Sequence, residues 1–552
     1  MPNNKANRIE TPQIRKSRQA EAHRLADSTR LLKYLAAILG GTLAFLSYPA
    51  INWTPLVAVA YVPYFWLLNR CQTIKETFWF SWLFSAVMTL GGFFWIAFTA
   101  VEFGGLPWIV AIPILLLYAS VGSINLAVTA GFVHFIKKRL SMRWQVIWVT
   151  GTFVLIEAFF PKLFYWYAGN AIYQVIPLIQ IADLGGPILL TTQIFWVNYA
   201  IFAAIDRWLM PRLRNVRHHH IFERKEAVTT ILVGVGMVGF SLVYGRFRLQ
   251  QVEKYSQAAV HKNVGVVQGN IGNFDRLMAR FGHEDTFRKV FDIHQDLTLH
   301  LAKKQSKPLD LVLWPEGAYP YPFPENHPEH RKLSNLSTIL RAPVVTGGYG
   351  RERKPVYQIF NTMVLMAPGG TTAESIYKKH ILLAFGEYMP FSKFIPALKD
   401  LIPAISDFGA GPGAVMMKHG DFKIASLICY EALDSHYMRA YSKQSPNLIL
   451  NVTNDSWFGP WQEPEQHLAL SQLRCVESRI VQVRSTNTGI SAIIWPSGKI
   501  TNRTEVYAPE VFAAEVPLMQ MPMTVYSQFG DWWAWLLAAV VIVMALLRKR
   551  GM

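Results

Sequence analysis

Long apolar blocks, separated by loops of unequal charge, constrain this chain more than any other feature of its sequence. A membrane-spanning helix needs about 20 apolar residues. Six blocks of suitable length lie at 31–49, 77–99, 108–135, 144–161, 188–206 and 228–246, and two shorter ones lie at 55–69 and 531–547. The pattern predicts an α-helical membrane bundle of about eight spans. Seven would precede a long region with shorter apolar runs, and one would follow it.

The loops between these blocks differ in their content of lysine and arginine. Eight such residues lie in 1–33, two in 70–76, four in 136–143, six in 207–227 and three in 548–550, whereas the alternate loops 50–54, 100–107 and 162–187 hold only Lys162. Because basic loops stay in the cytoplasm, both termini are expected there and the region 247–530 on the opposite side. The net charge of +18 is therefore read as a topology signal, and no nucleic-acid partner is expected.

The chain is expected to divide into a membrane part and one enclosed soluble domain. The expected parts are a basic cytoplasmic segment at 1–30, a seven-span bundle at 31–246, a soluble domain at 247–530 with its core at 262–518, a last span at 531–547 and a cytoplasmic tail at 548–552. Strands are expected in the core at Val264–Gln268, Leu309–Trp314, Pro343–Gly347, Thr362–Ala367, Lys423–Cys429, Asn447–Val452 and Ile490–Trp495, with helices near 284–304, 330–341 and 465–483. Strands that are apolar on both faces indicate sheets covered by helices, and hence an α/β domain.

Three polar residues of this domain stand where apolar, strand-like runs end. Cys429 follows Phe-Lys-Ile-Ala-Ser-Leu-Ile, Glu316 closes Leu-Val-Leu-Trp-Pro-Glu, and Lys379 lies in Tyr-Lys-Lys-His. A thiolate is a nucleophile, a nearby carboxylate can take its proton, and an ammonium group can stabilise an oxyanion. The set is typical of a Glu-Lys-Cys acyl-transfer site. A helix that opens after Cys429 is expected to lower the pKa of the thiol.

Other interpretations of these residues stay open at this stage. A cysteine at the end of a strand is, taken alone, more often a small core residue. His380, His436 or His467 offers a Cys-His pair with Cys429 in place of the Glu-Lys-Cys set. Three adjacent histidines, His218–His220, lack the spacing of a metal site. No metal and no cofactor is expected.

Two loops of the soluble domain are unusually rich in aromatic residues. They are Ala318–Pro324 (Ala-Tyr-Pro-Tyr-Pro-Phe-Pro) and Trp457–Trp461 (Trp-Phe-Gly-Pro-Trp). Exposed apolar loops beside a bilayer are expected to enter it or to line a path for lipid. The alternative is that both loops pack on their own domain.

Five motifs place these residues in a wider context. They are Val-Gln-Gly-Asn-Ile (267–271), Trp-Pro-Glu (314–316), Tyr-Lys-Lys-His-Ile-Leu-Leu-Ala-Phe-Gly-Glu-Tyr-Met-Pro (377–390), Ile-Cys-Tyr-Glu (428–431) and Asn-Asp-Ser-Trp-Phe-Gly (454–459). With them the chain resembles the nitrilase superfamily and, within it, the apolipoprotein N-acyltransferase family, whose domain is also inserted before the last span. The resemblance implies a nitrilase-like αββα sandwich that faces the periplasm of a bacterial inner membrane.

The resemblance also implies roles for individual residues. Glu316, Lys379 and Cys429 would form the catalytic triad, with Lys379 chosen over Lys378 because it lies eight residues before Glu387. Supporting residues would be Glu387, Tyr430 and Glu431, and candidates for substrate or lid contacts are Phe385, Trp457, Phe458 and Phe274. Phe274 stands near the position where the family often has a tryptophan.

The implied reaction has two steps and two lipid substrates. Cys429 would take an acyl chain from a phospholipid, typically phosphatidylethanolamine, and form a thioester. The α-amine of the diacylglyceryl-cysteine of an apolipoprotein would then accept the chain. Lipid substrates explain why the domain needs a membrane bundle, whereas a water-soluble amide would not require one. A membrane-anchored amidase or nitrilase remains the alternative, followed by a non-catalytic scaffold.

Overall fold

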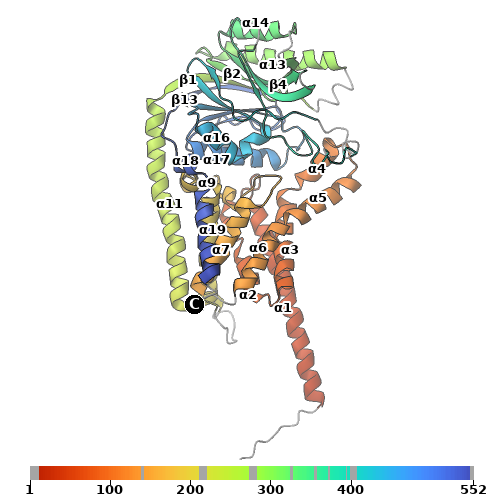
Figure 1. Cartoon of the computed structure of the whole chain (residues 1–552), viewed down its shortest axis with the longest axis vertical. Coiled ribbons are helices and arrows are strands. Elements are labelled where there is room, and N and C mark those ends of the chain that lie inside the picture. The colour runs from red at the N-terminus through yellow and green to blue at the C-terminus, as the bar shows by residue number, and fades with distance from the viewer. Residues whose placement is uncertain are drawn as a thin grey trace, which may run out of the picture.

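A bundle of long helices carries one α/β domain at one of its ends in the computed structural model (Figure 1). The structure describes residues 12–137, 142–210, 221–272, 282–323, 327–353, 357–370, 373–392, 394–397 and 407–547. In chain order the bundle contains α1 (Pro12–Leu46), η1 (Thr54–Ala58), α2 (Val62–Arg70), α3 (Ile74–Gly92), α4 (Trp95–Glu102), α5 (Trp108–Gly122), α6 (Ile124–Lys137), α7 (Met142–Phe159), η2 (Ala168–Ile172), α8 (Ile176–Ile179), α9 (Ala182–Ala204), η3 (Ile205–Leu209), α11 (Arg224–Ala258) and α19 (Trp532–Leu547). The outer face of α11 exposes large apolar side chains, among them Leu232 and Val235, as expected for a helix that faces lipid.

The described helices confirm a multi-pass membrane bundle but do not establish eight spans. Among the described residues, four stretches are long and apolar enough to cross a membrane alone: Thr29–Leu46, Trp108–His134, Ala182–Leu209 and Arg224–Ala258. Helices α3 and α4, bent by 53° at a short break, make a fifth if they form one span, and Trp144–Phe159 and Trp532–Leu546 are shorter apolar helices. The block expected at 55–69 contains the short η1 and the nine-residue α2. At 1.5 Å per residue, α2 reaches about 14 Å, roughly half of the hydrocarbon core.

Two β-sheets face each other in the α/β domain. The first has the order β13-β1-β2-β4-β5-β6, with β3 paired to β4, and the second has the order β12-β11-β10-β9-β8-β7. The strands are β1 (Val260–Gln268), β2 (Leu311–Leu313), β3 (Tyr319–Phe323), β4 (Val344–Glu352), β5 (Gln358–Met366), β6 (Ser375–Lys378), β7 (Met417–His419), β8 (Phe422–Ile428), β9 (Leu448–Thr453), β10 (Gln482–Thr486), β11 (Ala492–Ile494), β12 (Ile500–Thr501) and β13 (Glu510–Leu518). Contacts of β1 with β10, β4 with β9 and β5 with β8 join the sheets through a shared apolar core.

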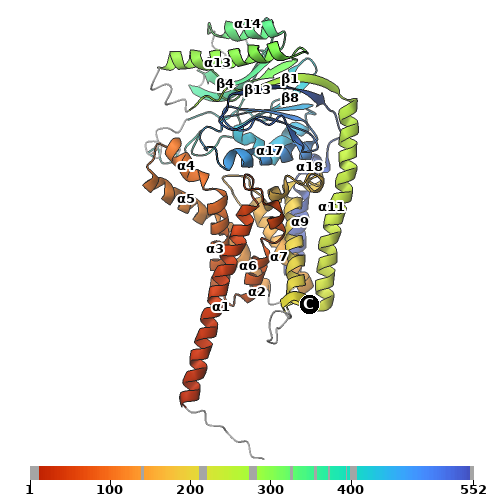
Figure 2. The same ribbon diagram turned by 180° about the vertical axis from the view of Figure 1, so that it is seen from behind.

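Helices cover the outer face of each sheet. Helices α13 (His283–Lys304) and α14 (His330–Leu340) pack on the first sheet, while α16 (Ser435–Ser442) and α17 (Glu463–Ser478) lie between the second sheet and the bundle. The view from behind shows the same layers and shows α11 rising along the bundle to reach β1 (Figure 2). The predicted αββα sandwich is thus confirmed. The boundary expected at 246/247 falls inside α11, which continues to Ala258.

One expectation about the aromatic loops is wrong. Tyr319–Phe323 is not a lipid-facing loop but strand β3, which pairs in parallel with β4 and is largely buried. The hydroxyl of Tyr319 bonds Nδ1 of His330 at 2.7 Å, and its ring packs on Phe291 of α13. Aromatic residues that alternate with proline suit an exposed loop and a short sheet strand equally well. The alternative, packing on the domain itself, holds here.

Buried polar contacts attach the domain to the bundle. Arg479 just after α17 donates from Nη2 to Oδ2 of Asp183 on α9 at 2.7 Å and from Nη1 to Oε1 of Gln180 at 2.6 Å. Asp183 also accepts from Nε of Arg248 on α11 at 2.8 Å. Since all these groups except Arg248 are almost fully buried, the contacts fix the orientation of the domain. Its α16–α17 side is held against the bundle.

Candidate active site

Three of the predicted site residues meet in the segments that follow strands β2 and β6. Lys379 directly follows β6, and its Nζ lies 2.8 Å from Oε2 of Glu387 and 3.9 Å from Oε1 of Glu316. Glu316 follows β2, and Glu387 lies in the turn after Lys379. Lys379 and Glu387 are buried, at 1% and 3% exposure. The structure therefore brings one ammonium group and two carboxylates together in a site of low dielectric constant.

Asn361 holds the two carboxylates in place, and sequence reasoning missed it. Its Nδ2 donates to Oε1 of Glu316 at 2.6 Å and to Oε1 of Glu387 at 2.8 Å. The second oxygen of Glu316 accepts from the backbone N–H of Asn454 at 2.8 Å. A signal was present in the sequence, because Asn361 and Thr362 are polar residues within an apolar strand, β5.

Cys429 lies at a sharp turn of the backbone. It follows β8 and opens η4 (Cys429–Leu433), a single 3₁₀ turn. Its φ of +51° lies in the left-handed region, which is costly for a residue other than glycine and is found mainly at functional sites. The thiol is buried and feels the charges of Glu316, Lys379 and Glu387. The triad expected from the sequence thus occupies one electrostatic environment.

Glu431 fixes the turn that carries Cys429. One of its carboxylate oxygens accepts from the N–H of Ile428 at 2.8 Å. The other accepts from the hydroxyl of Tyr377 at 2.7 Å and from the N–H of His380 at 2.7 Å. Because the N–H of Ile428 immediately precedes the thiol-bearing residue, Glu431 sets the backbone conformation at the turn. Its position supports a structural role rather than a chemical one.

Burial governs the protonation states in this site. Burial, and then the negative charge of Glu316, raises the pKa of the Cys429 thiol. The expected lowering by a helix N-terminus is wrong, because η4 is one short turn and desolvation outweighs it. Burial also raises the pKa of Glu316, against the opposing effect of Lys379. For Lys379 burial acts downward, but Glu387 and Glu316 raise its pKa overall, so the amine stays charged. The resting site holds a neutral thiol, an ammonium group and a carboxyl suited to accept a proton.

Tyr430 and two of the predicted lid residues contact the bundle. The hydroxyl of Tyr430 donates to the carbonyl of Leu163, in the segment that follows α7. Trp457 stacks on Phe103 with ring centroids 4.4 Å apart. Phe458 is buried, with its ring 5.2 Å from that of Trp95 on α4. The expected lid candidates Trp457 and Phe458 thus line the junction between domain and bundle.

The other lid candidates have different positions. Phe385 is 51% exposed and has a φ of +65°, two residues before Glu387. Phe391 and Phe394 further along the same segment are more exposed still. Phe274 lies outside the described residues.

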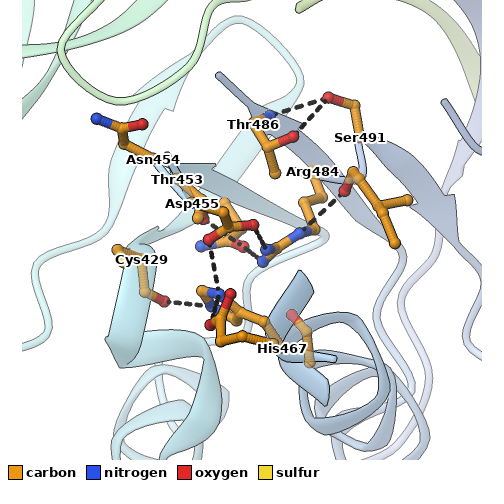
Figure 3. A network of polar contacts seen from close by, with 12 residues as sticks. Cys429, Thr453, Asn454, Asp455, His467, Arg484, Thr486 and Ser491 are labelled. Carbon is orange, nitrogen blue, oxygen red and sulfur yellow. Dashed lines mark hydrogen bonds and ion pairs between the residues drawn. The ribbon is translucent and has the colours of Figure 1, made fainter. Parts of the chain in front are cut away.

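The three histidines considered as partners of the thiol each contact a different group. His380 contacts the carbonyl of Gly411 through Nδ1, and His436 lies 3.3 Å from Asp531. His467 lies closest to Cys429, but Nε2 contacts the backbone carbonyl of Cys429 at 3.2 Å (Figure 3). Within the described part of the chain, no imidazole bonds the thiol itself. The segment His218–His220 lies outside that part.

Comparison with known proteins agrees with the architecture. The sequence model of the family described as Carbon-nitrogen hydrolase matches residues 248–522, and that of the Apolipoprotein N-acyltransferase N-terminal domain matches residues 40–200. The chain is therefore a membrane-bound acyltransferase with a nitrilase-type domain. Apolipoprotein N-acyltransferase from Bdellovibrio bacteriovorus is 30% identical over 543 residues, which cover 93% of each chain. That from Geobacter metallireducens is 30% identical over 526 residues, or 94% of this chain and 96% of the relative. The chain belongs to the apolipoprotein N-acyltransferase family.

Solved structures with similar domains are more distant. An amidase from Nesterenkonia sp. AN1 has 16% sequence identity and a TM-score of 0.36, over 53% of this chain and 98% of the amidase. A nitrilase-superfamily member from Saccharomyces cerevisiae has 17% identity and a TM-score of 0.36, over 49% of this chain and 93% of its own.

Proposed function

We propose that the protein transfers an acyl chain from a membrane phospholipid to the N-terminal α-amine of diacylglyceryl-cysteine in apolipoproteins, through a thioester on Cys429. The observation that carries the proposal is the cluster of Glu316, Lys379 and Glu387, whose charges act on the Cys429 thiol. The residue that follows Cys429, Tyr430, bonds the segment after α7 of the membrane bundle. Phosphatidylethanolamine is the proposed donor, and no cofactor is needed for acyl transfer.

In the first step Glu316 takes the proton of the Cys429 thiol, and the sulfur attacks the ester carbonyl of the phospholipid. The net charge of the site does not change when the proton moves from the thiol to the carboxylate. The low dielectric constant of the site therefore does not oppose this proton transfer. Lys379 stabilises the oxyanion of the tetrahedral intermediate, while Glu387 keeps the ammonium group in position. The bond to the glycerol oxygen then breaks, Glu316 returns the proton to that oxygen, and a lysophospholipid leaves.

In the second step the neutral α-amine of the acceptor attacks the thioester carbonyl. Glu316 takes a proton from the attacking nitrogen, and Lys379 again faces the oxyanion. The carbon–sulfur bond breaks, the amide forms, and the proton passes to the leaving sulfur. The same base and the same cation serve both steps, since each step forms a tetrahedral intermediate at one carbonyl carbon.

Access from the lipid phase supports lipids as substrates. Tyr430, which follows the thiol residue, and Trp457, in the loop that binds Glu316, both contact the bundle. The exposed aromatic segment with Phe385, Phe391 and Phe394 is continuous with the turn that carries Glu387. Acyl chains from the outer leaflet would meet apolar side chains at this level.

The proposed location is the bacterial inner membrane, with both termini in the cytoplasm and the catalytic domain in the periplasm. The basic loop 70–76 lies at the end of the bundle far from the domain, which agrees with the positive-inside rule. A membrane-impermeant thiol reagent tests this orientation in whole cells. The reagent should label an Asp421→Cys variant when only the outer membrane is permeabilised. A Lys75→Cys variant should react only after the inner membrane is also permeabilised, and the reverse pattern would contradict the orientation.

One experiment tests the reaction itself. The purified protein is incubated with phosphatidylethanolamine carrying a labelled acyl chain, and a hydroxylamine-sensitive adduct on Cys429 is expected. Addition of a diacylated lipopeptide with a free α-amine should move the label to that amine. The Cys429→Ser variant should give no hydroxylamine-sensitive adduct. Adduct that is lost only to water would indicate an amidase, and labelling that survives in the Ser variant would remove Cys429 from its role.

A further inference from the structure

A buried polar chain connects Cys429 to the loop that binds Glu316 (Figure 3). His467 on α17 contacts the carbonyl of Cys429 through Nε2 at 3.2 Å and Oδ1 of Asp455 through Nδ1 at 3.1 Å. Asp455 directly follows Asn454, whose N–H donates to Glu316. The nucleophile and its proposed base are thus tied to one short loop, and His467 is the link on the side of the nucleophile.

The contacts define the protonation of His467. A backbone carbonyl has no proton to give, so Nε2 must be the donor to Cys429. Nδ1 lies 3.1 Å from Oδ1 of Asp455 and 3.4 Å from Oε1 of Glu463. Burial acts upward on the pKa of Asp455, but His467 and Arg484 lower it overall, so this carboxylate accepts a hydrogen bond from a protonated Nδ1. Burial and Arg484 lower the pKa of His467, but Asp455 and Glu463 raise it overall. The ring is an imidazolium that is held at both nitrogens.

The cluster also has the residue types of a cation site. The ligand atoms of Asp455, Glu463 and His467 all lie within 4.8 Å of one another. However, Nη2 of Arg484 lies 3.2 Å from Oδ2 of Asp455. A guanidinium and an imidazolium therefore already compensate the charge of Asp455, and a divalent cation would add uncompensated positive charge to a buried site. The charges favour an ion network without metal.

We propose that His467 is a positioning residue for acyl transfer, whose ring, fixed by Asp455, holds the Cys429 turn in the geometry that presents the thiol to Glu316. This inference rests on the proposed role of Cys429 as nucleophile. The left-handed φ of Cys429 makes such support necessary, because a strained conformation persists only where its surroundings hold it. Glu431 fixes the turn at the N–H of Ile428, and His467 fixes it at the carbonyl of Cys429.

Two substitutions of His467, by side chains of equal length, distinguish a positioning role from a packing role. In His467→Gln the side-chain amide nitrogen takes the place of Nε2 and still donates to the Cys429 carbonyl. In His467→Met a side chain of similar size has no donor. We expect His467→Met to form the thioester about 10²-fold more slowly, since small misplacements of reacting groups cost about that much. His467→Gln should recover to within about tenfold of wild type. The KM for phospholipid should stay unchanged in both, because lipid binding does not use this contact.

The controls keep the outcomes distinct. Thermal midpoints of both variants are measured in detergent, and if His467→Met does not fold, Asp455→Asn is used instead, with a loss of about 10–100-fold expected. Equal rates for the Met and Gln variants, whether both fast or both slow, would overturn the inference. Activity that disappears with a chelator and returns with zinc would also overturn it, in favour of a metal. A fully active Cys429→Ser variant would defeat the proposed function itself.

Discussion

Replacing Lys379 with methionine removes the ammonium group that lies 2.8 Å from Glu387 and 3.9 Å from Glu316. Breaking a buried ion pair by removing one partner costs about 3–5 kcal/mol, because the remaining charge stays buried. Asn361 would still donate to both carboxylates, which places the expected loss of unfolding free energy near the lower value. Thioester formation should fall by about 10²–10³-fold, as for the loss of one oxyanion donor.

The pH dependence of the Lys379→Met variant follows from the same charges. Without the cation, burial and the neighbouring charge of Glu387 raise the pKa of Glu316 in the folded state with no opposing positive charge. A carboxyl with a raised folded pKa stabilises the fold most below its unfolded pKa and loses that contribution as pH rises. The variant should therefore approach wild-type stability in acid and fall further below it toward neutral pH. Thermal midpoints in detergent between pH 4 and 8, together with the rate of labelling of Cys429, measure both effects.

The adjacent lysine provides a matched control. Lys378 is part of β6 and points to the other face, where it pairs with Glu352 and lies 4.5 Å from the ring centre of Phe360. Surface ion pairs contribute about 0–1 kcal/mol, so Lys378→Met should leave the rate and the midpoint almost unchanged. The reasoning would be refuted if Lys379→Met kept wild-type labelling, or if Lys378→Met lost as much activity.

Three further predictions address the base, a buried carboxyl and the domain junction. Glu316→Gln keeps the volume but cannot take a proton, so adduct formation at saturating phospholipid should slow by about 10²–10⁴-fold; a normal rate would exclude Glu316 as the base. Burial raises the pKa of Glu463 from 4.5 to about 7, so its contribution to stability is present below pH 4.5 and is lost as pH rises through about 7. Glu463→Gln should flatten the fall in thermal midpoint over that range, and an unchanged curve would argue against the shift. Arg479→Met should cost about 3 kcal/mol, because Asp183 keeps Arg248 as a partner, and an unaltered midpoint would contradict the role of this contact in docking the domain.

Much of the site was predictable because its chemistry lies in short motifs. Glu316, Lys379 and Cys429 each stand at the end of a strand, and such ends meet when strands lie in facing sheets. The partners that hold them were not predictable in this way. Asn361 lies within a strand, and His467 lies on a helix 38 residues beyond Cys429. Nothing local to either residue indicates which carboxylate or carbonyl it reaches.

In the bundle, too, the features set by a short stretch of sequence were predictable, and those set by contacts between distant segments were not. Apolar length and loop charge predicted helical spans, because insertion into a bilayer depends on about 20 consecutive residues at a time. The number of spans depends on the bend between α3 and α4 and on the shortness of α2, which neighbouring helices decide. The segment Tyr319–Phe323 is similar, since pairing with β4 rather than composition made it a buried strand.

The sequence alone is enough to predict a membrane-anchored α/β enzyme and to propose Glu316, Lys379 and Cys429 as its reacting residues. Those properties follow from residue type, from periodicity and from the length of apolar runs. The directions of the pKa shifts, the bridge made by Asn361 and the support of the Cys429 turn depend on the three-dimensional packing. The physical reason is that burial and charge act through space, so the pKa of the thiol reflects groups that the chain order keeps far apart, such as Glu316 and Asp455.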